Sequence, residues 1–188
     1  MGYPRPSRYH PDAMSDKWDI SKRQPLPKKR VRMHTAEHIL TAVMHRLFAT
    51  GSVPSPGNLE MHLGEKKSKC DYTVSHPISM EEIAAIEDTV NAEIEKDYQI
   101  TTEIVPIEEA KTTYDLWKVP PDAATIRIVK IGNIDATPCR GKHVSHTNQI
   151  GRFRIKSYTM REENVVRIRF GVEDILMIQP SIGTENRG

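Results

Sequence analysis

The chain has 188 residues, of which 37% are hydrophobic and 28% charged, and its formal net charge is +2. This length and apolar content suffice for one domain with a substantial core, and no uninterrupted apolar run reaches membrane-spanning length. The N-terminus also lacks the apolar segment of a signal peptide. We therefore expect a cytoplasmic protein without membrane association, in which the two cysteines stay reduced.

Positive charge is concentrated at the front of the chain. Residues 1–32 hold nine Lys and Arg against three Asp, which leaves a slightly acidic remainder. Residues 1–30 are rich in proline and lack helical or strand periodicity, so we expect an extended arm there, followed by one domain over residues 31–188. The arm could bind a polyanion such as RNA through its basic side chains, or it could be a solvated tail.

Two main helices are predicted. Between residues 33 and 49, apolar side chains recur at steps of three and four, which indicates a helix with one core-facing stripe. The second helix is predicted at residues 79–96. It begins with Ser79 and Glu82, the S-x-x-E pattern of a capping box, and continues with apolar residues at helical steps.

The other predicted elements are mostly strands, identified from short apolar or alternating runs between turn residues. They are a hairpin of residues 59–63 and 68–74, strands at 101–105, 125–131, 152–156 and 166–170, and a short helix at 107–113. The fold class is therefore expected to be α+β, with a mostly antiparallel sheet packed against two main helices.

The last two predicted strands alternate basic and apolar residues and are expected to pair. One face would then carry like charges opposite one another, which is unfavourable without a counter-charge. RNA phosphates could supply it, and so could nearby acids such as Glu162, Glu163 and Glu173. The basic residues of this face are Arg152, Arg154, Lys156, Arg167 and Arg169.

Two residue pairs at four-residue spacing indicate a metal site. His34 and His38 fall on one face of the first helix and can direct two imidazoles at a single point. Cys139 and His143, which we expect on a turn after Pro138, add a thiolate and a third imidazole. One cysteine and three histidines suit Zn²⁺, so one zinc ion per chain is expected.

The role of this metal is open at the level of sequence. Four protein ligands favour a structural zinc, but a chain of this size can build its core without one, and a catalytic zinc keeps a position for water or substrate. Glu37 does not have the spacing of the zinc-protease H-E-x-x-H motif. It could orient one of the metal ligands, but we expect it to be an exposed helix residue. Neither the zinc-deaminase pattern nor a G-x-S-x-G nucleophile elbow is present. Cys70, in a predicted strand, is expected to be a buried small hydrophobe.

The motifs resemble those of a known family. The segment from His34 to Leu40, the Cys139 to His143 motif and the following segment from Thr147 to Ile155 are similar to the editing domain of alanyl- and threonyl-tRNA synthetases. The free-standing AlaX proteins share this domain, and residues 114–120 resemble the short AlaX type in particular. The resemblance implies a synthetase second-additional-domain fold for nearly the whole chain beyond the arm.

The resemblance further implies a hydrolase that acts in trans on the acceptor end of mischarged tRNA. It would cleave the ester of a wrongly attached amino acid, typically serine on tRNA(Ala). The metal ligands that it implies are His34, His38, Cys139 and His143. Two alternatives are a Ser-tRNA(Thr) deacylase and a non-catalytic, zinc-stabilised RNA-binding module.

Contacts with the substrate are predicted on chemical grounds. Selecting serine over alanine calls for a buried polar group that binds the seryl hydroxyl and is left unpaired by alanine. Thr35, Asn58 and Thr147 are candidates, and helix capping or turn formation would explain them as well. Arg140 and Lys142, which depart from the C-G-G-T-H form of the synthetase motif, could meet phosphates of the tRNA or point into solvent.

Overall fold

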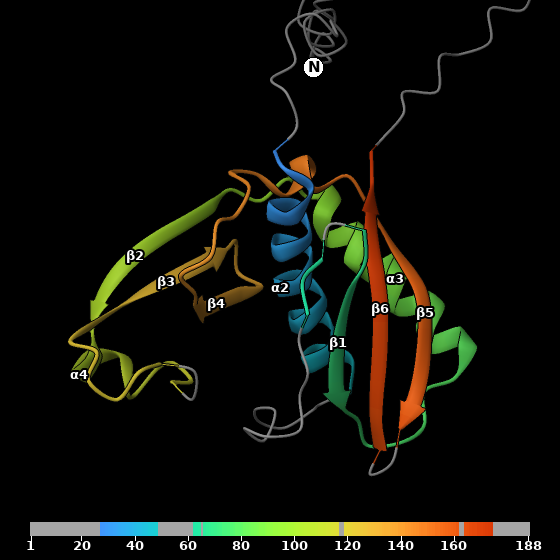
Figure 1. Ribbon diagram of the computed structural model, residues 1–188, viewed down its shortest axis with the longest axis horizontal. Helices are drawn as coiled ribbons and strands as arrows, with labels where there is room; N and C mark the ends of the chain where they lie inside the picture. Colours follow the sequence, from blue (N-terminus) through green and yellow to red (C-terminus); the bar gives the residue numbers. More distant parts are fainter. Residues whose placement is uncertain (1–26, 49–61, 65, 117–118, 162–163, 175–188) are drawn as a thin grey trace, which may run out of the picture.

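The computed structural model of the protein describes residues 27–48, 62–64, 66–116, 119–161 and 164–174. These residues form three α-helices and two antiparallel three-stranded sheets (Figure 1). The predicted α+β class is thereby confirmed, although the strands form two separate sheets. Among the described helices, none is long and apolar enough to cross a membrane.

Helix α2, Lys29–Phe48, begins four residues before the predicted start. Lys29 and Arg30, expected in the extended arm, therefore lie in its first turn. Arg32 anchors this turn, because its buried guanidinium donates from Nε to Ile150 O at 2.8 Å. The predicted apolar stripe is buried at Ala36, Ile39, Leu40, Val43 and Phe48, whereas Leu47, also expected in it, is 44% exposed.

Helix α3, Met80–Glu95, begins where the sequence predicts. The Ser79 side chain accepts from Glu82 N at 3.2 Å, and the Glu82 carboxylate accepts from Ser79 N at 2.8 Å. This capping box satisfies two N–H groups for which the helix itself has no acceptor. Ile86 and Val90 then face the core with no exposed surface.

The first sheet has the strand order β1-β6-β5. Its strands are β1 (Ser68–Thr73), β5 (Arg152–Arg161) and β6 (Val165–Glu173). Strands β5 and β6 pair antiparallel as predicted, and β5 is longer than expected because it resumes its pairing after a bulge. Alternate side chains of this sheet, Cys70 among them, pack against α2 and α3 in the main core.

The predicted hairpin of residues 59–63 and 68–74, whose second strand is β1, is present only in part. Residues 59–61 lie outside the described part of the chain, and His62 forms an isolated bridge with Lys69. Strand β1 pairs along its length with β6 instead.

The second sheet has the order β2-β3-β4. It consists of β2 (Ile100–Pro106), β3 (Thr125–Ile131) and β4 (Asp135–Pro138), and helix α4 (Ile107–Ala110) follows β2. Strand β4 was not predicted, because it is four residues long and ends in a proline. Ala110, Ile126 and Ile128 form a small core of their own under this sheet.

Helix α2 stands between the two sheets (Figure 1). It contacts β1 and β6 of the first sheet and β4 of the second. A 3-10 helix, η2 (Thr147–Ile150), leads from the second sheet back to β5. Because β4 ends beside α2, the residues that follow it are carried to the helix face that bears the two histidines.

Candidate metal centre

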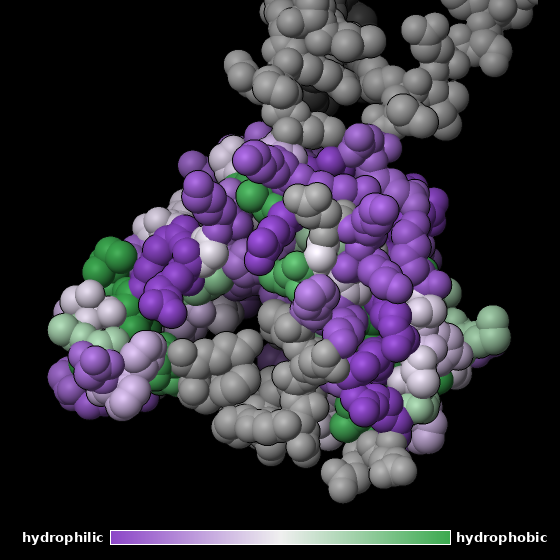
Figure 2. All heavy atoms as spheres, in the orientation of Figure 1, coloured by the Kyte–Doolittle hydropathy of each residue, from purple (hydrophilic) through white to green (hydrophobic). Residues whose placement is uncertain are grey.

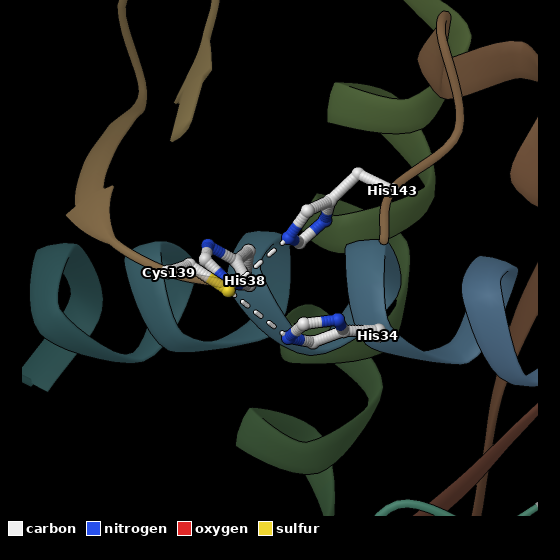
Figure 3. Close-up of side chains that lie close together, drawn as sticks. All are labelled: His34, His38, Cys139 and His143. Atoms are coloured by element: carbon white, nitrogen blue, oxygen red, sulfur yellow. Dashed lines mark hydrogen bonds between the residues drawn. The ribbon is translucent and has the colours of Figure 1, made fainter. Parts of the chain in front are cut away.

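Four side chains from two distant parts of the chain converge beside α2. His34 and His38 project from the helix, while Cys139 and His143 come from the loop that begins directly after β4 (Figure 3). Their possible ligand atoms all lie within 4.8 Å of one another. The Cys139 sulfur is 3.5 Å from His34 Nε2 and 3.4 Å from His143 Nε2. The structure thus brings together the four residues that the sequence singled out.

The loop is held in place by β3. Cys139 N donates to Arg127 O at 3.0 Å, and Arg127 Nη1 donates in return to Cys139 O at 3.1 Å and Gly141 O at 2.8 Å. A Cβ at position 141 would overlap the His34 ring, so only glycine permits this close approach. Glycine at position 141 therefore lets the loop bring Cys139 close to the helix histidines.

Each histidine ring is oriented through its Nδ1 atom. His34 Nδ1 lies 3.2 Å from Lys142 O, and His38 Nδ1 lies 2.7 Å from the Asp135 carboxylate. Both partners can only accept, so both Nδ1 atoms carry the hydrogen in these bonds. Deprotonating the opposite nitrogen, Nε2, leaves a lone pair directed at the cluster, which is the arrangement found at metal-bound histidines.

Thr35 decides the orientation of the third ring. Its hydroxyl donates to Val31 O at 3.2 Å and accepts from Val144 N at 3.2 Å. Because the single hydroxyl hydrogen is already used, the contact of 3.2 Å with His143 must be donated by the ring Nδ1. His143 therefore also presents Nε2 to the cluster. Thr35, predicted as a substrate contact, has all its hydrogen-bonding capacity used within the protein.

The electrostatics of the cluster favour the ionised, thiolate form of Cys139. Burial alone would raise the pKa of Cys139, but hydrogen bonds from His143, His34 and His38 outweigh burial and lower this pKa to about 3. Burial also acts to lower the pKa of His38, but its bonds to Asp135 and Cys139 raise this pKa to about 10. A metal cation therefore meets a thiolate already formed and competes with one proton for His38 Nε2.

The donor set fits a metal ion. A thiolate and three imidazoles are ligand types that zinc sites use. The ring of each imidazole is also held by a hydrogen bond at Nδ1, as is usual for metal-bound histidines. Asp135, which is 12% exposed and contacts His38, is a residue of this site that the sequence analysis missed. The only sequence signal was an acid four positions before the cysteine.

The other predicted contacts are placed differently. The Thr147 hydroxyl donates to Ile94 O at 2.9 Å and accepts from Tyr98 N at 3.0 Å, so it joins η2 to the end of α3. Arg140 and Lys142 are exposed in the ligand loop. Asn58 lies outside the described residues.

The predicted basic strand face exists, but acids of the protein neutralise much of it. Asp71 on β1 is buried and accepts from Arg167 Nε at 2.7 Å and from Arg161 Nη1 at 3.1 Å. Figure 2 shows hydrophilic side chains covering this side of the first sheet. The counter-charge that the pairing of β5 and β6 requires thus comes in part from β1.

Further acids pair with the remaining cations of this face. Arg154 lies 2.9 Å from Glu87 of α3, and Glu173 pairs with both Arg154 and Lys156. Arg169 donates to Thr159, and Arg152 is exposed. Glu173 was one of the acids expected there, whereas Glu162 and Glu163 lie outside the described residues.

One comparison with known proteins bears on this site. Residues 126–169 match the family model of the threonyl and alanyl tRNA synthetase second additional domain. The matched segment extends from β3 into β6 and contains Cys139 and His143, while His34 and His38 precede it. This part of the chain is therefore similar to that synthetase domain, which supports an editing-domain-like family.

Proposed function

We propose that this protein is a free-standing, AlaX-type deacylase that removes wrongly attached serine from tRNA(Ala) and uses one zinc ion. The observation that carries the proposal is the convergence of three oriented imidazoles and one thiolate in a chain with its own core. The similarity of residues 126–169 to the synthetase domain supplies the link to tRNA.

Zinc is proposed because it accepts mixed thiolate and imidazole ligands. When bound, Zn²⁺ polarises an ester carbonyl and lowers the pKa of a water molecule. An aminoacyl ester is already an activated bond, so positioning and polarisation suffice without a covalent nucleophile. The chain's own residues fix the ligands: Asp135 orients His38, and Thr35 orients His143.

The acceptor end of the tRNA would approach along the ligand loop. Arg140 and Lys142 are exposed on either side of Gly141, and the Lys142 backbone contacts His34. Two cations beside the proposed metal can hold phosphates of the acceptor end in register with the site. The basic arm predicted over residues 1–30, without Lys29 and Arg30 of α2, would add affinity to the domain that follows it.

A deacylation time course tests the proposal. Native protein, chelator-treated protein and treated protein restored with zinc are each incubated with Ser-tRNA(Ala), Ser-tRNA(Thr) and Ala-tRNA(Ala). The proposal predicts zinc-dependent loss of serine from tRNA(Ala), with alanine spared. Metal analysis of the same samples reports how much zinc each one holds.

The other outcomes separate the alternatives. Loss of serine from tRNA(Thr) alone would move the assignment to that substrate. Tight binding of tRNA without hydrolysis would make the protein a zinc-stabilised RNA-binding module and would refute the enzymatic proposal.

A further inference from the structure

Glu37, expected to be exposed, is buried. It lies on α2 directly before His38 and is only 4% exposed. Its Oε1 accepts from Thr41 Oγ1 at 2.9 Å, and within the described residues no cation pairs with the carboxylate. A buried carboxylate is normally paired with a cation or saturated with hydrogen bonds, because removing its charge from water is costly.

The other buried acids among the described residues follow this rule. Asp71 pairs with Arg161 and Arg167, as described above. Glu93 on α3, 3% exposed, lies 2.8 Å from Arg46 and 2.9 Å from Lys96. Each of these two acids thus has two cationic partners within the protein, so the lack of one at Glu37 calls for an explanation.

The hydrogen bonds around Glu37 form a directed chain. Thr41 uses its hydroxyl hydrogen toward Glu37, so in its 3.0 Å contact with Tyr72 it must accept, and the Tyr72 hydroxyl must donate. Burial keeps the pKa of Tyr72 well above its usual value, which preserves this donor. The chain fixes Oε1, and within the described residues the second oxygen, Oε2, accepts no hydrogen bond.

Glu37 lies beside the candidate metal centre. It is three residues after His34, a spacing at which Cβ atoms on a helix are about 5–6 Å apart. Its charge also acts on His38 and contributes to the raised pKa of that ring. Both observations place Glu37 on the part of α2 that carries two of the four ligand residues.

We propose that Glu37 binds the α-ammonium group of the aminoacyl moiety. This inference rests on the proposed deacylase function. Every aminoacyl ester carries this amino group on the carbon next to the reacting carbonyl, and α-amino groups are largely protonated at neutral pH. The substrate thereby supplies the cation that Glu37 lacks, while Thr41 and Tyr72 hold the carboxylate in place.

A pair of non-hydrolysable ligands tests this role without relying on turnover. One ligand is serine joined by an amide bond to 3′-amino-3′-deoxyadenosine, and the other replaces serine with 3-hydroxypropanoate, which lacks only the amino group. Calorimetry on zinc-loaded wild-type protein should show the amino ligand binding about tenfold to a hundredfold more tightly, the range for a hydrogen bond to a charged group. In Glu37→Gln the two affinities should come within a few-fold of each other.

Two further variants keep the test selective. Glu95→Gln changes an exposed acid of α3 and should keep the full preference for the amino ligand. Thr41→Val leaves the Glu37 carboxylate without its anchor and should reduce the preference by less than Glu37→Gln does. Metal content and circular dichroism check that each variant is folded and loaded.

The outcomes distinguish this inference from the proposed function. If wild-type protein deacylates Ser-tRNA(Ala) but binds both ligands equally, the ammonium role is wrong and the deacylase proposal stands. An equal loss of affinity for both ligands in Glu37→Gln would also overturn the role, because Glu37 would then act on the site as a whole. Absence of both hydrolysis and ligand binding would refute the proposed function and this inference with it.

Discussion

The outer face of the first sheet and the α2 face beside the metal centre handle charge in opposite ways. On the sheet, Asp71 and Glu173 each pair with two basic residues, so the charges compensate one another within the protein. Beside α2, four potential ligands converge and the Glu37 carboxylate has no cationic partner among the described residues. The difference separates charges that already have partners within the protein from charges that could pair with a bound ion or substrate.

The largest expected effect comes from removing a ligand residue. His38→Ala takes away one of the four donors and its bond to Asp135, so zinc binding and deacylation should both be abolished. The protein should nevertheless stay folded, because none of the four ligand residues belongs to the main hydrophobic core. Metal analysis, a deacylation assay and thermal unfolding measure the three quantities.

His45→Ala is the matched control for this variant. His45 is exposed on the same helix and belongs to no described cluster of possible ligands. It should retain full zinc content and activity. Unfolding of His38→Ala at the temperature where wild type is intact would show that the metal is structural.

The second prediction concerns the ion pairs on the outer face of the first sheet. Asp71→Ala removes the buried carboxylate that pairs with Arg167, whose side chain is 13% exposed, and should lower the free energy of unfolding by about 3 kcal/mol. Denaturant titration measures this, and the zinc affinity of the folded protein should not change. Glu108→Ala, which breaks the exposed pair with Lys111, should alter stability by less than about 1 kcal/mol.

A smaller effect is expected from the residue that orients His38. Asp135→Asn keeps the shape of the side chain but weakens its hold on the ring, and should reduce zinc affinity about 10- to 100-fold. Competition with a chromophoric chelator gives this affinity. Asp122→Asn changes an exposed acid just before β3 and should have no effect on zinc affinity. An unchanged affinity in Asp135→Asn would refute the orienting role.

The smallest expected effect is on tRNA binding, and it compares the cations of the ligand loop with those of the first sheet. Arg140→Gln with Lys142→Gln should weaken tRNA binding and reduce the slope of log affinity against log salt by about one for each phosphate that the protein no longer neutralises. The matched control is Lys156→Gln, which removes a cation already paired with Glu173 and should leave the slope unchanged. A reduced slope in Lys156→Gln, with an unchanged slope in the loop variant, would place the RNA on the outer face of the first sheet.

Several elements were predictable because their signals are local. The Ser79 and Glu82 capping box and the apolar spacing behind it lie within one helix, and α3 begins where they indicate. The strand at 125–131 matches β3, because its apolar run ends in a sharp turn at Gly132, which has a positive φ. Strand β4 has no such signal, since it exists only through its pairing with β3.

The sequence alone identified the four candidate ligands of the metal centre, because each pair has a spacing with a chemical meaning. Three other features depended on the tertiary structure: the hydrogen bond from Asp135 to His38, the pairing of Asp71 with the basic strand face, and the burial of Glu37. Each requires residues far apart in the chain to meet. Periodicity along a sequence shows which side of an element a residue occupies, but only packing decides which partner it finds there.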